Sequence, residues 1–250
     1  MHKDHFWYHG RYHFLLSLFR KFVVSSRDSS KRLDIIDLGA GTGEWAHVLR
    51  KQNSSLIDTL AVGDSSVKAL RALDGNDEGI LRCQVDVTEM IWKEEWDVVF
   101  LLDVIEHIED DVRVLGGMHT ALRKGGTLVL SVPALMAFWS YNDEIVHHKR
   151  RYSRREIIEK AKSVGFEILD VRYYMFLLSP LVWLSRKSSR KTADLTEQQM
   201  FELLRRTHRV PNRFVNSILK FVLRMEASIG SAVPLPWGTS AYAVLRKSAD

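Results

Sequence analysis

The sequence predicts an α/β fold in which helices cover both faces of a seven-stranded, mostly parallel sheet. Short apolar runs of strand length recur along the chain and alternate with stretches of helical pattern, which is typical of βαβ units. A turn with three glycines follows the first of these runs and leads into a segment of helix-forming composition. At 250 residues the chain is long enough for one such domain with a buried core.

Each element has its own signal. An aromatic entry followed by an amphipathic pattern predicts a helix within residues 5–24. Apolar runs predict strands at 33–38, 59–63, 81–85, 96–102, 126–132, 166–174 and 239–246. Ser153 with Glu156 three residues later is a capping-box pattern, so a helix is expected over 153–164. We divide this single domain into an N-terminal helical cap (1–32), a ligand-binding core (33–174), a mostly helical insertion (175–237) and a closing strand (238–247).

The glycine turn is the most informative segment, and it reads Asp37-Leu38-Gly39-Ala40-Gly41-Thr42-Gly43. Glycine allows the backbone to pass close to a ligand. The spacing differs from the dinucleotide motif Gly-x-Gly-x-x-Gly, because the third glycine position of that motif holds Glu44. A carboxylate at Asp37 would repel a pyrophosphate but suits a cation, such as the amino group and sulfonium of S-adenosylmethionine. The alternative is an ordinary tight turn.

This turn resembles the first motif of the class I S-adenosylmethionine-dependent methyltransferases, which has the form Asp-x-Gly-x-Gly-x-Gly. The resemblance implies a Rossmann-like sheet and S-adenosylmethionine as the cofactor. It also implies cofactor contacts from the residues of the turn, namely Asp37, Gly39, Ala40, Gly41 and Gly43.

Two further acids follow strands at the same edge of the expected sheet. Asp64 lies 25 residues after Gly39, close to the spacing of about 20 at which an acid meets a ribose in doubly wound folds. We expect it, with Ser65 beside it, on the ribose; the alternative is a cap for the helix that starts near Val67. Asp86, followed by Val87, is placed to accept a hydrogen bond from the adenine amino group. The alternative is that Asp86 caps a loop.

The fourth strand continues into Asp103-Val104-Ile105-Glu106-His107, which resembles the matching segment of small-molecule methyltransferases of the ubiquinone-biosynthesis type. The resemblance implies that Asp103 and Val104 border the methionine end of the cofactor and that His107 points to the substrate. Asp103, Glu106 and His107 could also hold a divalent metal. Helix capping explains the acids without an ion, and no metal is expected.

Two more segments resemble one branch of these enzymes. Trp7-Tyr8-His9-Gly10-Arg11 matches its Trp-aromatic-x-Gly-Arg start, which implies a cofactor contact for Arg11. Asp143 and the run from His148 to Tyr152 match its pattern of an Asp followed by a His-x-Arg-Arg-Tyr segment, although His147 replaces the glycine that normally precedes the His.

The catalytic candidates come from the second of these segments and from the fourth strand. His148 is the first candidate for a general base and His107 the second, because histidine titrates near working pH. Both could instead be structural. Arg151 and Tyr152 could orient an anionic substrate or cap the helix that follows. Trp7 and Tyr8 could close over a sulfonium or pack on the sheet.

Composition limits the class of protein. With 46% apolar and 27% charged residues the sequence is that of a globular protein, and one cysteine excludes a disulfide framework and a cysteine-based zinc site. No apolar run reaches the roughly 18–20 residues of a membrane-spanning helix. We expect a cytoplasmic protein, with peripheral membrane contact as an option. Residues 173–184 are apolar and precede the basic stretch 183–224, where ten Lys/Arg face three Asp/Glu. That pairing suits an anionic membrane surface; the alternatives are a solvated basic surface, a lid and a dimer interface.

The leading functional hypothesis is methyl transfer from S-adenosylmethionine to a small-molecule acceptor, such as a sugar, a quinone-like compound or a lipid-linked intermediate. Methylation of RNA or DNA is an alternative, which the basic stretch favours. The fourth strand lacks the Asn/Asp-Pro-Pro-aromatic motif of enzymes that methylate a flipped base, so nucleic acid is not the expected partner. A non-catalytic or NAD-binding α/β protein is a third class, and the glycine spacing argues against NAD.

Overall fold

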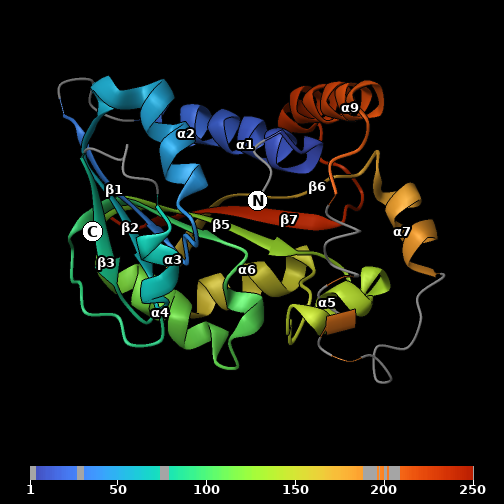
Figure 1. Ribbon diagram of the computed structural model, residues 1–250. Coiled ribbons are helices and arrows are strands. Elements are labelled where there is room, and N and C mark those ends of the chain that lie inside the picture. The colour runs from blue at the N-terminus through green and yellow to red at the C-terminus, as the bar shows by residue number, and fades with distance from the viewer. Residues whose placement is uncertain are drawn as a thin grey trace.

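The computed structural model describes residues 4–26, 31–73, 79–187, 196, 198–199, 202 and 209–249. Within these residues seven strands form one sheet in the order β3-β2-β1-β4-β5-β7-β6 (Figure 1). The strands are β1 (Leu33–Leu38), β2 (Ile57–Asp64), β3 (Ile80–Gln84), β4 (Trp96–Leu102), β5 (Leu122–Pro133), β6 (Phe166–Tyr174) and β7 (Ser240–Lys247). Only β7 runs antiparallel, between β5 and β6. The predicted fold class is confirmed.

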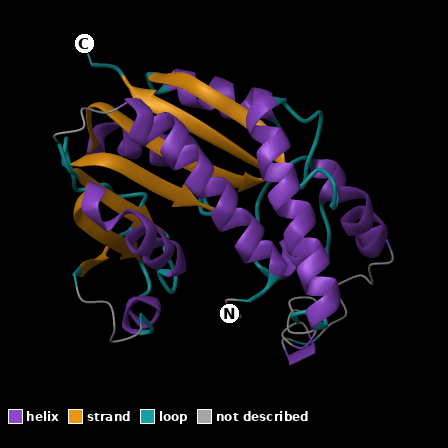
Figure 2. Cartoon of the chain, turned by 90° about the horizontal axis from the view of Figure 1, so that it is seen from above, coloured by secondary structure: helices purple, strands orange, loops and turns teal. Residues whose placement is uncertain are grey.

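Helices cover both faces of the sheet, and Figure 2 shows them crossing over the strands. The longer ones are α1 (Phe6–Leu18), α2 (Glu44–Asn53), α4 (Asp111–Ala121), α6 (Arg154–Ser163) and α9 (Arg213–Ala232); α3 (Val67–Arg71), α5 (Tyr141–Ile145) and α7 (Ser179–Lys187) are shorter. Alternate residues of each central strand enter different cores. Phe100 packs with α1 and α2, whereas Val99 and Leu101 pack with α4 and α6. Because both faces are covered, these strands are almost continuously apolar.

The N-terminal helix departs from the expected amphipathic pattern. Phe14, Leu15 and Phe19 are buried against the sheet, while α9 covers another side of α1. A Cβ added at Gly10 would lie 2.5 Å from Leu223 Cδ1, so the glycine allows the two helices to approach closely. A helix enclosed by a sheet and a second helix needs apolar residues on more than one face.

Several element ends differ from prediction for local reasons. β2 begins at Ile57 because Gln52 and Asn53 complete α2 and a 3₁₀ turn spans Ser54–Leu56. β5 begins at Leu122 rather than at the predicted residue 126, and its pairing with β4 shifts register between Leu122 and Thr127. The capping box of α6 is confirmed, since Ser153 Oγ accepts from the Glu156 N–H and Glu156 Oε2 accepts from the Ser153 N–H.

The insertion contributes α7 and α9 to the described part of the chain, while residues 188–195 and 203–208 of the predicted helical segment lie outside it. Glu226 of α9 holds the segment just before α7, because its buried carboxylate accepts the backbone N–H of Phe176 and of Leu177. None of the helices described is long and apolar enough to cross a membrane.

Candidate active site

A cleft of about 940 Å³ opens at the carboxyl ends of β1 and β4. Open α/β sheets bind ligands at this edge. The start of α1, the glycine turn, α5 and α7 complete its walls. Nine of the predicted site residues line it: Arg11, Asp37, Gly39, Ala40, Gly41, Asp103, His107, His148 and Arg151.

The glycine turn leaves room for a ligand. Gly39, Gly41 and Gly43 have φ angles of +68°, +57° and +67°, a region that side chains disfavour. A Cβ at Gly39 would collide with Val104 and one at Gly43 with Leu73. A Cβ at Gly41 would meet nothing within 4 Å, so this position faces open space at the cleft. The turn therefore lets a ligand lie against bare backbone at Gly41.

Asp37 is a buried carboxylate at the bottom of the cleft. It is 3% exposed, and its Oδ1 has no hydrogen-bond partner among the described residues. Burial raises the pKa of Asp37 to about 7, against a smaller opposite effect of Arg11. A carboxylate in this state gains from a cation placed beside it. This is the observation that best fits the positively charged cofactor expected here.

Arg11 and Asp103 form an ion pair across the cleft wall. Arg11 Nη1 lies 2.9 Å from Asp103 Oδ2, and Ser131 Oγ donates to Asp103 Oδ1 at 2.7 Å. Asp103 has φ +56°, an uncommon value for a residue with a side chain. The Arg11 guanidinium also lies 5.1 Å from the centre of the Trp7 ring. Trp7 therefore already faces a cation of the protein.

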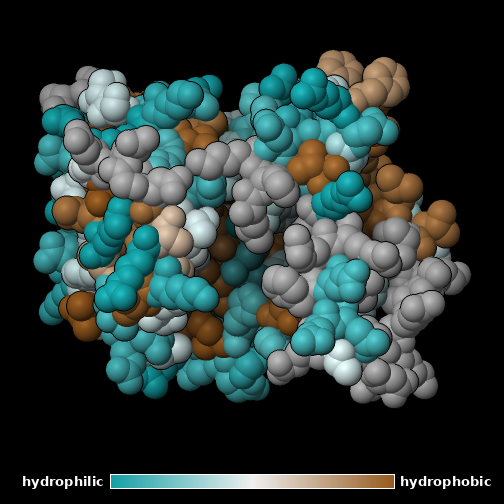
Figure 3. Space-filling view, in the orientation of Figure 1, coloured by the Kyte–Doolittle hydropathy of each residue, from teal (hydrophilic) through white to brown (hydrophobic). Residues whose placement is uncertain are grey.

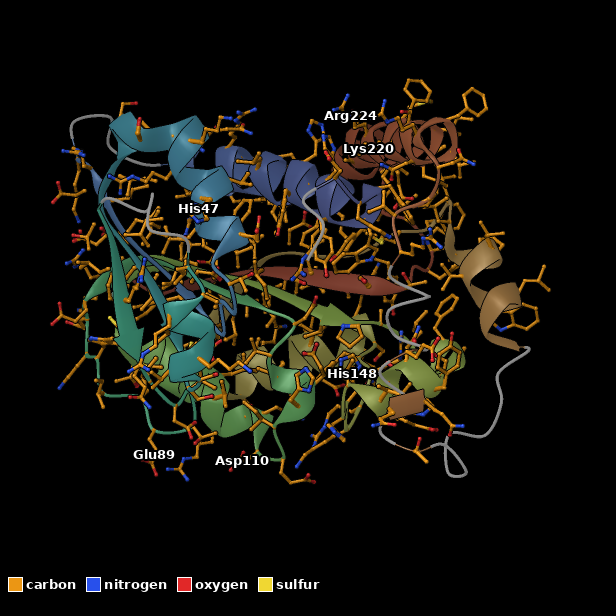
Figure 4. All side chains as sticks on the ribbon, viewed as in Figure 1. His47, Glu89, Asp110, His148, Lys220 and Arg224 are labelled. Carbon is orange, nitrogen blue, oxygen red and sulfur yellow. The ribbon has the colours of Figure 1, made fainter. Side chains whose placement is uncertain are left out.

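Another part of the cleft wall is formed by Asp143, His148 and Arg151, and the Asp143 carboxylate binds both of the other side chains (His148 is labelled in Figure 4). His148 Nδ1 lies 2.9 Å from Asp143 Oδ1, and Arg151 contacts both oxygens of the same carboxylate at 2.8 and 3.0 Å. Burial alone would raise the pKa of Asp143, but the hydrogen bonds from His148 and Arg151 outweigh it and lower the pKa to about 2. Ionised Asp143 accepts the Nδ1 proton, so neutral His148 keeps a lone pair on Nε2.

Arg151 does not have the substrate-orienting geometry that the sequence suggested. Its Nε and Nη2 donate to Asp143, and its Nη1 donates to the carbonyls of Ala134 and Thr239. These bonds use the guanidinium to hold Asp143, and through it His148, against the end of β5. We assign Arg151 a positioning role.

Glu106 and His107 complete this side of the cleft. Both carboxylate oxygens of fully buried Glu106 lack a hydrogen-bond partner in the described structure, and burial raises the pKa of Glu106 well above its usual value. Burial and the neighbouring His148 lower the pKa of His107. One ligand atom each from Glu106, His107 and His148 lies within 4.8 Å of the others, a grouping that could hold a metal ion. Asp103, which the sequence suggested for such a group, instead pairs with Arg11.

The remaining predicted residues do not line the cleft: Gly43, Asp64, Ser65, Asp86, Val87, Val104 and Tyr152. Asp64 ends β2 and accepts the Gly41 N–H at 2.9 Å and the Ser66 N–H at 2.8 Å, while Ser66 rather than Asp64 caps α3. Asp86 is exposed and accepts twice from Thr88, which is the loop-cap alternative.

Tyr152 is the clearest correction among them. It is 1% exposed, and its hydroxyl donates to Asp111 Oδ2 at 2.7 Å. Burial and this hydrogen bond raise the pKa of Tyr152. The Tyr152 hydroxyl therefore bonds inside the core between the sheet and helices α4 and α6. We do not retain the substrate-orienting role for Tyr152.

Sequence reasoning left some lining residues unassigned. Tyr12 and Trp45 line the cleft and stack at 5.9 Å between ring centres, and Asp143, which binds His148 and Arg151, also lines it. The signal for Asp143 was present, since the branch resembled by 147–153 carries an Asp before its His-x-Arg-Arg-Tyr segment. Tyr12 lies four residues after Tyr8, and this spacing could have placed the two rings on one helix face.

Comparison with known proteins agrees with this geometry. The chain belongs to the methyltransferase-domain family, whose model matches residues 7–171. Within that family it is an S-adenosylmethionine-dependent methyltransferase, as the expected resemblance implied.

Individual relatives are distant. The chain is 23% identical over 156 residues to malonyl-[acyl-carrier protein] O-methyltransferase 1 of Ilyobacter polytropus, covering 60% of this chain and 58% of that relative. An S-adenosylmethionine-dependent methyltransferase of Mesorhizobium loti aligns with a TM-score of 0.54 and 16% identity, over 89% of this chain and 94% of that one. Phosphoethanolamine N-methyltransferase 2 of Haemonchus contortus, solved with S-adenosyl-L-methionine, aligns with a TM-score of 0.56 and 17% identity, over 93% and 52%. These structures share the fold.

Proposed function

We propose that this enzyme methylates an oxygen of a small-molecule acceptor, such as a sugar, a quinone-like compound or a lipid-linked intermediate, with His148 as the general base. The observation that carries the proposal is the His148–Asp143 pair, which faces the cleft across from the glycine turn. An acceptor hydroxyl must lose its proton during methylation, and a positioned base accelerates such a step by roughly 10²–10⁴-fold. The distant O-methyltransferase relative also favours oxygen as the acceptor atom.

The cofactor side of the cleft is assigned to the turn and its acids. S-adenosylmethionine supplies a methyl group on a positively charged sulfur. We assign its amino end to Asp37 and its contact with the backbone to Gly39, Ala40 and Gly41. For the ribose we retain Asp64, because each of its oxygens accepts one backbone N–H and keeps a further lone pair. Asp86 remains a prediction from the sequence for the adenine amino group, since its contacts in the structure are the loop-cap bonds to Thr88.

The acceptor side lies between His148 and α7. Leu181 and Val182 of α7 line the cleft, so the acceptor is expected to carry an apolar part. The acceptor oxygen attacks the methyl carbon, the carbon–sulfur bond breaks, and the acceptor proton passes to His148 Nε2. The products are the methyl ether and S-adenosylhomocysteine. Asp143 keeps its charge and stabilises the imidazolium that forms. His107 is the second candidate base, and its lowered pKa keeps it neutral at physiological pH.

The test follows label from S-adenosylmethionine carrying a tritiated methyl group. The full-length enzyme is incubated with a whole lysate of its source cells. The lysate is then separated into lipid, aqueous small-molecule, nucleic-acid and protein fractions, and tritium is measured in each fraction. We expect label in a small molecule. Label confined to RNA, DNA or protein would contradict the proposed acceptor class.

Two histidine variants then test the base. We expect His148→Ala to lower kcat by about 10²–10⁴-fold while the Kd for S-adenosylmethionine changes less than about twofold. His147→Ala is the matched control. The His147 side chain is exposed, and its left-handed backbone (φ +59°) disfavours alanine as much as it disfavours histidine. Full activity in His148→Ala would remove His148 as the base.

A further inference from the structure

The outer face of α9 carries a stripe of large apolar side chains. Phe214, Ile218, Phe221, Met225 and Ile229 follow one another at steps of three or four residues and therefore share one face. Phe214 is 76% exposed and Phe221 62% exposed, and the others are each exposed by nearly half. Figure 3 shows apolar side chains projecting from this corner of the molecule. Because the inner face of α9 packs on α1, the stripe is not needed for the fold.

Basic residues line one edge of this stripe. Arg213, Lys220 and Arg224 are seven and four residues apart, so they lie along the same side of α9 (Lys220 and Arg224 are labelled in Figure 4). Glu226 is the one acid in α9, and it is buried against Phe176 and Leu177. The chain from 183 to 224 carries ten Lys/Arg and three Asp/Glu. Lys220 is 22% exposed and lies 3.9 Å from the exposed carboxylate of Asp4, and Arg224 contacts His9. Arg213 and Arg224 are therefore the exposed cations beside the stripe, and α9 itself presents no exposed acid.

We propose that the stripe on α9 docks on an anionic lipid bilayer, with the helix lying along the surface. A helix with an apolar face and Lys/Arg on its edge binds in this way through buried apolar area and attraction to anionic lipid. Charge favours an anionic surface as the occupant, because Arg213 and Arg224 are exposed beside the stripe and α9 presents no exposed acid. The apolar stripe on α9 is a feature separate from the 173–184 segment that the sequence suggested.

Docking here would place the cleft beside the lipid. Glu226 fastens the chain before α7 to α9, and Leu181 and Val182 of α7 line the cleft, while Leu181 is also 62% exposed. Trp237 donates to Ser179 at the start of α7, which ties the end of the insertion to the same corner. This step rests on the proposed function and deepens it, since a bilayer at α7 and α9 suits a lipid-linked acceptor.

The experiment is sedimentation of the full-length protein with vesicles. One set contains phosphatidylcholine alone, and the other contains phosphatidylcholine with about a third phosphatidylglycerol. We expect binding to the anionic vesicles that weakens as NaCl is raised. Equal binding to both sets, or no binding to either, would overturn the proposal.

Paired variants locate the surface. We expect Phe214→Ser with Phe221→Ser to weaken anionic vesicle binding at least about tenfold. Leu81→Ser with Ile91→Ser is the matched control, because these apolar residues are also exposed but belong to β3 and the loop before β4, and we expect it to bind like the parent. If the phenylalanine variant instead converts a dimer to a monomer in light scattering, the face is a subunit contact and the proposal fails.

Measuring cofactor binding distinguishes a failure of the membrane-docking proposal from a failure of the proposed methyltransferase function. Calorimetry with S-adenosylmethionine in the absence of vesicles should give the same Kd for parent and phenylalanine variant. Loss of vesicle binding at an unchanged Kd supports α9 as the docking surface. Absent methyl transfer to any small molecule would refute the proposed function and leave the vesicle result standing.

Discussion

Two acids in one cleft show how residue environment decides chemistry. Asp37 and Asp143 are both buried, yet burial dominates at Asp37 and raises its pKa to about 7, while hydrogen bonds from His148 and Arg151 lower the pKa of Asp143 to about 2. Asp143 therefore acts as a fixed anion that orients a histidine. Asp37 is an acid whose charge depends on what binds beside it.

We predict that cofactor affinity depends on pH through Asp37. The folded-state pKa of about 7 exceeds the usual aspartate value of 3.8, so the apoprotein loses stability as pH rises from about 4 to about 7. A cationic ligand favours the ionised form, and the Kd for S-adenosylmethionine should improve about tenfold from about pH 6 to about pH 8. Isothermal calorimetry across this range measures it.

The Asp37→Asn variant isolates the effect, because titration of the ligand itself is common to both proteins. We expect Asp37→Asn to bind S-adenosylmethionine more weakly than the parent. Its Kd should also lack the part of the pH dependence that comes from Asp37. Asp58→Asn, which changes an exposed carboxylate, is the control and should keep the parent profile. A parent profile in Asp37→Asn would show that Asp37 does not meet the cation.

At the scale of elements, the turn between β1 and α2 is where backbone conformation and ligand access coincide. Three glycines there adopt positive φ, but they differ in surroundings: added side chains at Gly39 and Gly43 would strike the protein, while Gly41 faces open space. His147 adopts the same left-handed backbone conformation although it carries a side chain. The resembling branch has glycine at this position, and His147 adopts φ +59°.

We predict that Gly41→Ala folds but loses most cofactor affinity. The left-handed backbone costs alanine roughly 1–2 kcal/mol of folding free energy, and the new methyl projects toward the cleft. Gly125→Ala is a matched control, because Gly125 has φ +75°, open space around its Cβ position, and no place in the cleft.

Thermal unfolding should therefore shift by a similar free energy in both variants. Calorimetry should show a Kd at least about tenfold higher only for Gly41→Ala. Equal affinity in the two variants would place the ligand away from the turn.

At the scale of the whole molecule, the N-terminal segment and the helical insertion meet beside the cleft. The side chain of Asn216 on α9 accepts the Phe6 N–H at 2.9 Å and donates to the Asp4 carbonyl at 2.8 Å. Residues 5–8 line the cleft. A residue of the late insertion thus fixes an early segment that covers the cofactor side.

We predict that Asn216→Ala weakens cofactor binding as well as stability. Losing both hydrogen bonds should reduce the free energy of unfolding by about 1–3 kcal/mol and raise the Kd for S-adenosylmethionine severalfold, because 5–8 lose their anchor. Asn212→Ala, which removes the N-cap of the same helix, should cost about 1 kcal/mol and leave the Kd unchanged. If both variants bind like the parent, the anchor does not shape the site.

The sequence alone determined the features that short-range rules govern. The strands at 33–38, 96–102 and 166–174, the capping box at Ser153 and the open glycine turn depend on neighbours a few residues away, and each is found as predicted. Tertiary structure alone decided which distant groups meet. Arg151 pairs with Asp143, the Tyr152 hydroxyl donates to Asp111, and Arg11 pairs with Asp103. A side chain's partners follow from the packing of whole elements, and a motif read along the chain gives the residue without its surroundings.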